Sequence, residues 1–211
     1  MIKKITIMLL SIILCAFSVS VVLKCAIGVG AWDAFSQTAS GILKMKVGTF
    51  SMFMNISCVV GQIIIKKQFK VALAMQIVLS VCLGILINFF YYQILANMQF
   101  NSYLSTILVF LLANASCAFA VGTVTAQNII SFPLEGLCMT IAVKTGKPFG
   151  KIRQQADIIT MIFVVVLVLV FDGQMTIREG TVIGMLIFGP LLDIYMRHIK
   201  PWMIKKQVFE D

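Results

Sequence analysis

The sequence predicts an all-α integral membrane protein with six long transmembrane helices and two short helices, arranged as two repeats. Three observations support this fold class. The 211 residues are 60% apolar and only 12% charged, whereas a soluble domain is nearer a quarter charged. At least five windows carry no charge over the roughly 20 residues that cross about 30 Å of hydrocarbon. The chain also resembles itself at a shift of 102 positions.

The apolar runs and the breaks between them predict the elements in order. Long spans are expected at 5–23, 48–65, 71–95, 102–124, 155–171 and 180–197. Two shorter helices are expected at 31–43 and 133–145. Thirteen residues rise only about 20 Å, which is too little to cross a bilayer unaided. Each short helix is therefore predicted to be re-entrant, interfacial, or a half-helix buried in protein.

The internal repeat is predicted from matches that apolar composition alone does not give. The segment LLSIILCAFSV (9–19) aligns with LLANASCAFAV (111–121), and AWDAFSQT (31–38) aligns with PLEGLCMT (133–140) in the same register. Gly48 then meets Gly150 and, after a three-residue slip, 84–88 meets 189–193. We interpret the chain as one membrane domain, 1–211, with repeats at about 5–95 and 103–197 and a short basic tail at 198–211.

Lysines and arginines predict how the chain lies in the membrane. With six crossings and both termini inside, only Lys24, Lys44, Lys46 and Arg178 lie outside. This agrees with the positive-inside rule and predicts a multi-pass plasma-membrane protein with cytoplasmic termini. If the short helices also cross, there are eight crossings and the charge bias is nearly as good. Six crossings make the repeats inverted and eight make them parallel; helix length favours six.

Several function classes find no support in this sequence. The net charge of +9 does not predict nucleic-acid binding, because the basic residues lie in short clusters at the ends of apolar runs. The six cysteines form no C-x-x-C pair and His198 is the only histidine. No metal site, cofactor site or nucleophile–base pair is therefore predicted, and an enzyme is not expected.

Both short helices have the same kind of start. With Gly30 as the N-cap of the first, Asp33 falls at the third helical position; with Phe132 as the N-cap of the second, Glu135 does so. In one interpretation these carboxylates only stabilise the helix starts. In the other they form a functional site, since a carboxylate at mid-bilayer costs about 2.5–3.5 kcal/mol and is a site candidate by default.

A polar stripe favours the functional interpretation for the first short helix. Asp33, Gln37, Ser40 and Lys44 have the spacing of one helix face. Further polar residues occur at aligned places in the two halves, and most of them are expected near one face of the membrane or the other. The predicted solute or ion site comprises Asp33, Gln37, Trp32, Glu135, Asn55, Asp157, Asn88 and Asp193. Alternatively, Asp157 and Asp193 are interfacial acids paired with Arg153 and Arg197, four residues away.

The element GVGAWD (28–33), its weaker echo PLEG (133–136) and the chain length resemble the YczE-like group of bacterial integral membrane proteins, which is related to the YitT-like proteins. The resemblance covers nearly the whole chain. It implies a multi-pass plasma-membrane protein without an established molecular function. In the family pattern Arg-Asp-Gly occupies the second copy, where this chain has Leu134, Glu135 and Gly136, so a role for that arginine does not carry over.

Two functions are consistent with these features. The first is a transporter-like protein, or a solute-binding membrane subunit, with lipid and a small solute as partners and a polar site between the short helices. The alternative is a non-transporting membrane scaffold or regulator of a partner protein, which would have a closed, dry centre. Gly180-x-x-x-Gly184 and Ser80-x-x-x-Gly84 are small-residue faces for packing within the monomer, or for a homodimer contact.

Overall fold

The computed structural model describes residues 2–100, 102–127, 129–171 and 173–205, with backbone alone at Ile2, Asp193, Met196, Ile199, Lys200 and 202–205. All secondary structure in these ranges is helical, as predicted. The helices are α1 (Ile2–Cys25), α2 (Ala31–Ile42), α3 (Val47–Lys66), α4 (Val71–Phe89, continued by a π-helical turn Phe90–Ile94), α5 (Tyr103–Ala126), α6 (Pro133–Thr145), α7 (Phe149–Phe171) and α8 (Glu179–Lys205).

Five of these helices are long and apolar enough to cross a membrane. They contain the segments Lys3–Cys25, Val47–Lys66, Val71–Ile94, Tyr103–Ala126 and Phe149–Phe171. In α8 the described residues add a shorter apolar segment, Glu179–Leu192. Large apolar side chains such as Leu112 and Leu169 point outward and are 69% and 79% exposed. These surfaces have the character of a membrane protein, because lipid covers such side chains at little cost. The sixth span stays a prediction.

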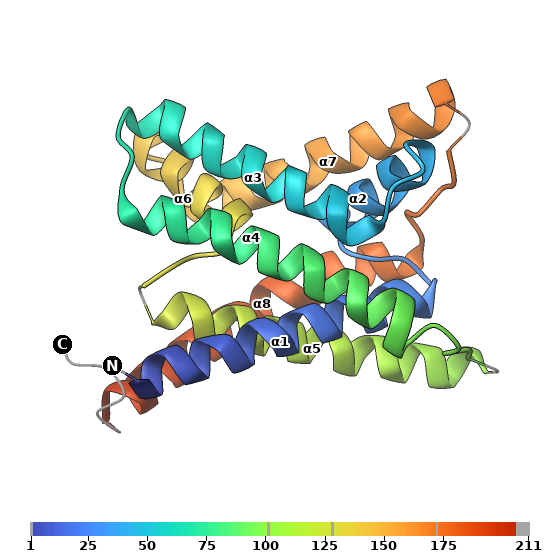
Figure 1. The fold of residues 1–211 in the computed structure, drawn as a ribbon, viewed down its shortest axis with the longest axis horizontal. Helices are drawn as coiled ribbons and strands as arrows, with labels where there is room; N and C mark the ends of the chain where they lie inside the picture. Colours follow the sequence, from blue (N-terminus) through green and yellow to red (C-terminus); the bar gives the residue numbers. More distant parts are fainter. Residues whose placement is uncertain (1, 101, 128, 172, 206–211) are drawn as a thin grey trace.

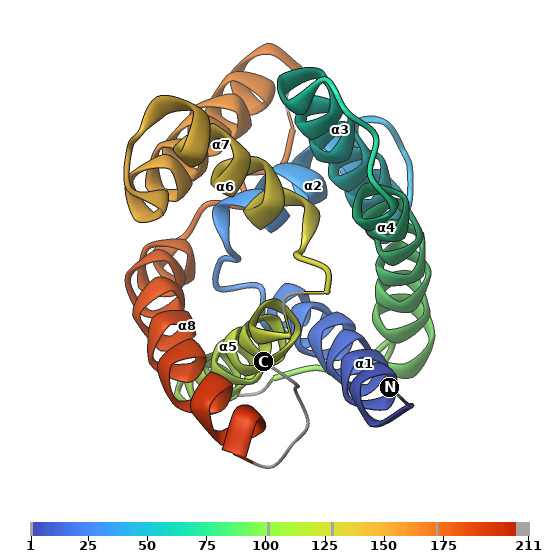
Figure 2. The same cartoon turned by 90° about the vertical axis from the view of Figure 1, so that its left-hand side faces the viewer.

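The six long helices form a ring around the two short ones (Figure 2). Around one part of the ring α3 packs on α4, α4 on α1, α1 on α5, and α5 on α8. Inside the ring α2 packs against α7 and α3, and α6 packs against the same two long helices. The starts of the short helices are thus surrounded by the long ones, whereas Met139 and Val143 further along α6 are 49% and 79% exposed.

Helices at matching places in the two halves run in opposite directions along the long axis of the molecule. In Figure 1 α1, α4 and α7 run from left to right, whereas α5, α8 and α3 run from right to left. Each helix of the second half is therefore antiparallel to the helix at the same place in the first half. The start of α1 and the end of α8 consequently lie at the same end of the molecule.

Each short helix begins near the middle of the long axis and runs back to the end from which the chain came (Figure 1). Before α2 the turn depends on Ala26 and Gly28, which have φ of +53° and +117°. A Cβ on Gly28 would lie 2.6 Å from the Thr181 nitrogen, so both conformation and space require glycine there. The Gly180 N–H donates to the Ile27 carbonyl at 2.8 Å and holds this loop against α8.

The second and third long helices of each half pack differently. In the first half a Cβ built on Gly84 of α4 would lie 2.5 Å from the Gly48 carbonyl oxygen of α3. Asn88 secures this contact by accepting from the Gly48 N–H at 2.9 Å. Gly150 and Gly189, which align with Gly48 and Gly84, have nothing within 4 Å of a built Cβ. In the described residues α7 and α8 make no packing contact comparable to that of α3 with α4.

Candidate functional site

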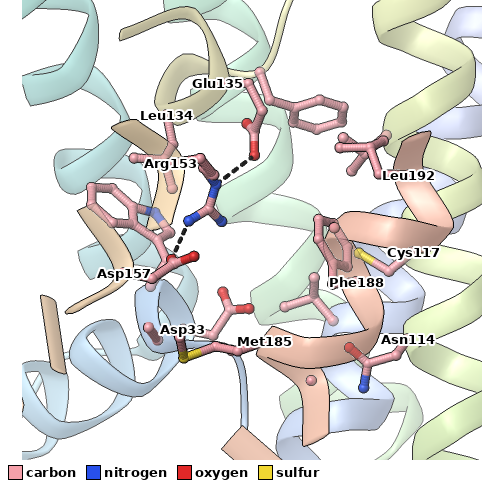
Figure 3. A pocket seen from close by; sticks show the side chains of 18 of the residues that line it. Asp33, Asn114, Cys117, Leu134, Glu135, Arg153, Asp157, Met185, Phe188 and Leu192 are labelled. Atoms are coloured by element: carbon pink, nitrogen blue, oxygen red, sulfur yellow. Dashed lines mark hydrogen bonds and ion pairs between the residues drawn. The ribbon is translucent and has the colours of Figure 1, made fainter. Parts of the chain in front are cut away.

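A cavity of about 590 Å³ lies inside the ring, and residues of all eight helices line it (Figure 3). Apolar side chains form most of its wall. The polar and charged lining residues are Trp32, Asp33, Ser51, Asn55, Asn114, Glu135, Arg153, Gln154 and Asp157. A polar set enclosed by a bundle with apolar outer faces is typical of a solute or ion site in a membrane protein.

The starts of the two short helices supply the first pair of acids. Gly30 and Phe132 are the N-caps, so that Asp33 and Glu135 lie in the first turns of α2 and α6, as predicted. Pro133 occupies the first position of α6, where its fixed φ suits a helix start. Because the two helices begin near the middle of the molecule, acids that are 102 positions apart in sequence face one cavity.

A buried amide network fixes the start of α6. The Gln62 Nε2 donates to Gln76 Oε1 at 2.7 Å and to the Pro133 carbonyl at 3.2 Å. Gln76 in turn donates to the Ser131 hydroxyl at 3.1 Å. This network joins α3, α4 and the start of α6. Gly136 is required beside this network, since a Cβ there would lie 2.8 Å from Gln62 Oε1.

Arg153 joins two of the three carboxylates. Its Nε lies 3.7 Å from Glu135 Oε1, and its guanidinium donates to Asp157 on the next turn of α7. The predicted pairing of Arg153 with Asp157 is confirmed. Figure 3 shows the three side chains in a row, with the Asp33 carboxylate facing the same space and no partner drawn to it. Two acids thus share one cation.

Asp33 makes no hydrogen bond or ion pair with the part of the chain that the structure describes. The helix start it was predicted to stabilise has no side-chain cap hydrogen bond. Its remaining structural role is the attraction between its charge and the positive end of the α2 dipole. Arg153 in the same cavity is already paired with Glu135 and Asp157. A carboxylate without an ion pair of its own in a largely apolar cavity is costly, which favours the functional interpretation for Asp33.

Three further uncharged polar residues of the wall come from α3 and α5. Asn55 is 9% exposed and Ser51, one turn before it on α3, is 6% exposed. Neither side chain has a hydrogen-bond partner among the described residues. Asn114 on α5 donates to the Phe110 carbonyl of its own helix at 3.1 Å, which leaves its oxygen free to accept. Sequence reasoning missed Ser51 as a site residue, although it precedes Asn55 by the same four residues that separate Arg153 from Asp157.

A comparison with protein families gives a match over nearly the whole chain. Residues 2–197 match a model described as "Family of unknown function (DUF6198)". The chain belongs to this family. No curated protein and no solved structure matches it. The family match has no link by name to the YczE-like or YitT-like proteins, so that resemblance rests on the motifs at 28–33 and 133–136 alone.

The structure brings together five of the eight residues predicted for the site. Trp32, Asp33, Asn55, Glu135 and Asp157 all line the cavity. The sequence predicted that polar residues of the two halves lie near opposite faces of the membrane. The structure instead places acids of both halves at one cavity, because the short helices carry Asp33 and Glu135 to the middle of the molecule.

Two of the other three predicted residues, Gln37 and Asn88, do not line the described cavity. Gln37 lies one turn further along α2, outside the lining. Asn88 binds the Gly48 N–H and donates to the Thr49 hydroxyl at 2.9 Å, so it holds α4 on α3. The side chain of Asp193 lies outside the described part of the chain. Lys44 follows α2 with φ of +53°, so the predicted polar stripe ends before it.

Proposed function

We propose that this protein is a transporter-like membrane protein of two inverted repeats, and that the central cavity is its solute site. One observation carries the proposal: a cavity of about 590 Å³ holds three carboxylates and one guanidinium inside a bundle of apolar helices. Secondary transporters bind solute near the bilayer midplane, at the interface of inverted repeats and beside the ends of broken helices. The scaffold alternative, with its closed, dry centre, loses support.

The contact between α1 and α5 supports the duplication. The Sγ atoms of Cys15 and Cys117 lie 3.9 Å apart, and these two cysteines align with each other at the shift of 102 positions. At a two-fold axis each residue meets its own counterpart. The antiparallel course of matched helices in Figure 1 supports an axis that runs across the helices, hence in the membrane plane.

The unequal packing of the two halves supports movement. In this structure the α3–α4 contact is closed through Gly48 and Gly84, and the aligned Gly150 and Gly189 stand open beside the cavity. We infer that a second state exchanges these arrangements: α7 closes on α8 while α3 separates from α4. Such an exchange opens the cavity alternately to the two sides, as expected of a rocking inverted-repeat transporter.

The proposed topology has six crossings of the plasma membrane, with both termini and the 66–70 loop in the cytoplasm. The Lys and Arg distribution supports it, as does the common end of α1 and α8. Labelling of a single cysteine at Gln68 in intact cells tests it. The reagent should reach this position only from the cytoplasmic side; reaction from outside would contradict six crossings.

Transport itself is tested through Cys117, which lines the cavity. In a variant whose only cysteine is Cys117, a membrane-impermeant thiol reagent should react when it is added to either side of sealed vesicles. A matched variant that keeps only Cys82, which is exposed on the outer side of α4, should react from neither side because lipid covers it. Reaction of Cys117 from one side only, or from neither, would contradict alternating access.

A further inference from the structure

We propose that the cavity binds a small organic cation, with its ammonium group against Asp33, Ser51 and Asn55. This inference rests on the proposed function, since it names the solute class of the same cavity. The three residues come from the first short helix and the second long helix, and all of them line the cavity.

The two halves of the chain supply the first argument. At the shift of 102 positions the residues Asp33, Ser51 and Asn55 align with Glu135, Arg153 and Asp157. In the second half Arg153 supplies the cation that joins the two acids. The first half has a serine at the place of the arginine, so Asp33 has no ion pair with a cation of its own half. A bound ammonium group would supply a counter-charge to Asp33, as the Arg153 guanidinium does for Glu135 and Asp157 in the second half.

The charge balance supplies the second argument. Among the described lining residues there are three carboxylates and one guanidinium, and no lysine. With all four groups ionised, the cavity carries two negative charges in excess. An anionic solute would add to this excess, and a neutral one would leave Asp33 without a counter-charge. A monovalent cation offsets one of these two charges and a divalent cation offsets both.

The free hydrogen-bonding atoms supply the third argument, and they are independent of the acids. Asn55 is more than nine-tenths buried, lines the cavity and has no partner in the described chain. The Ser51 hydroxyl and the Asn114 oxygen are likewise unused. Carboxylate, amide and hydroxyl oxygens all accept, so this part of the wall suits an ammonium group. The buried Trp32 Nε1 of the same lining has no partner among the described residues and can donate to an acceptor elsewhere on the solute.

The size and wall of the cavity indicate an organic ion. A volume of about 590 Å³ is within the range of small-molecule sites and is far larger than a single metal ion needs. Most of the wall is apolar, and Trp32, Phe132, Phe149 and Phe188 contribute aromatic rings. Aromatic faces attract ammonium groups and an apolar wall suits a hydrocarbon body. A monatomic cation would leave most of this surface unused.

The charge preference can be measured without knowledge of the natural solute. The variant with Cys117 as its only cysteine is treated with two methanethiosulfonates of similar size, one trimethylammonium and one sulfonate. The rate of Cys117 labelling by the trimethylammonium reagent is divided by the rate with the sulfonate reagent. This ratio is then divided by the same ratio for 2-mercaptoethanol, and the result should be at least about tenfold in favour of the cation. Asp33→Asn should lower it several-fold. Glu179→Gln, the same charge change at an exposed residue outside the cavity, should leave it unchanged.

Binding is tested in the same preparation with choline and 3,3-dimethylbutan-1-ol, which share a shape and differ in charge. Choline at millimolar concentration should slow the labelling of Cys117 at least about threefold. The alcohol should not, and Asp33→Asn should abolish the choline effect. Equal protection by both compounds, protection by neither, or an unchanged effect in Asp33→Asn would overturn the proposal, provided that size-exclusion chromatography shows the variant folded.

The outcomes separate the two proposals. Labelling of Cys117 from both sides without a charge preference or choline protection would leave alternating access standing and overturn the cation site. Charge-selective, choline-protected labelling from one side only would support the cation site and overturn transport. Labelling from neither side would overturn both.

Discussion

The closed α3–α4 contact and the open α7–α8 pair predict different effects on stability when glycine is replaced by alanine at the aligned positions Gly84 and Gly189. The Cβ of Gly84→Ala would lie 2.5 Å from the Gly48 carbonyl oxygen and 2.8 Å from the Met52 Cβ. Because the clash is with backbone, which cannot simply move aside, the overpacking cost is at the upper end of the usual range, about 2–3 kcal/mol. The higher helix propensity of alanine than of glycine offsets about 1 kcal/mol of this cost. The net loss in free energy of unfolding is about 1–2 kcal/mol.

Gly189→Ala is the matched control, because nothing lies within 4 Å of its built Cβ. The propensity gain of about 0.5–1 kcal/mol is opposed by Pro190, whose ring disfavours a helical residue with a Cβ directly before it, so the free energy of unfolding should change little. For a chain of this length 1 kcal/mol corresponds to about 2–4 °C in Tm. Thermal unfolding of the purified proteins should therefore show a fall of several degrees for Gly84→Ala and little change for Gly189→Ala.

The same pair separates folding from movement. If α7 must approach α8 as closely as α3 approaches α4, Gly189→Ala disfavours the second state by about 1–3 kcal/mol and changes the stability of this state little. Labelling of Cys117 should then fall at least about fivefold from one side of the membrane and persist from the other. Equal losses of Tm in the two variants, or no loss in Gly84→Ala, would refute the reasoning.

Three further predictions concern the cavity. Asp33→Asn and Asp33→Ala should differ in free energy of unfolding by less than about 0.5 kcal/mol, because no cap hydrogen bond is lost; a fall of about 1 kcal/mol in the alanine variant alone would show that the side chain caps α2. Arg153→Met should lower the free energy of unfolding by about 1–2 kcal/mol, since two carboxylates lose their cation. Glu135→Gln added to Arg153→Met should recover part of that loss; a Tm of the double variant below that of Arg153→Met would contradict the shared ion pair. Mild oxidation should join Cys15 to Cys117 within one chain, visible as a mass decrease of about 2 Da in the unreduced protein, because a small side-chain rotation brings their sulfurs to bonding distance; failure to cross-link in any condition would contradict the packing of α1 on α5.

Local signals in the sequence were enough to predict the order of the helices and the starts of most of them. Glycine and proline at the breaks, and acids three positions into each short helix, predict starts at Ala31 and Pro133, where α2 and α6 begin. The start of α7 was wrong: the apolar run predicts 155, whereas the helix begins at Phe149. The difference arises because Arg153 is neutralised by an acid from α6, which a reading of single apolar runs does not include.

The assembly of the site was beyond such signals. Ser51 and Asn114 are ordinary polar residues within apolar helices, and only the packing of α3 and α5 around the centre gives them a common cavity. The same holds for Asn88, whose amide was predicted for the site and instead satisfies the Gly48 N–H. Side chains that need a partner from another element can be recognised as polar in the sequence, but their partner depends on tertiary contacts.

The midpoint start of the two short helices has an electrical consequence. Helices of 12 and 13 residues divide the molecule so that a solute at their starts lies about halfway between its two ends (Figure 1). Moving one elementary charge across 100 mV is worth about 2.3 kcal/mol, so a cation held halfway gains or loses about 1.1 kcal/mol. Across a membrane with a negative interior, occupancy from outside would rise about sevenfold per 100 mV and occupancy from inside would fall by the same factor. The cell's resting voltage would thereby set the direction of loading.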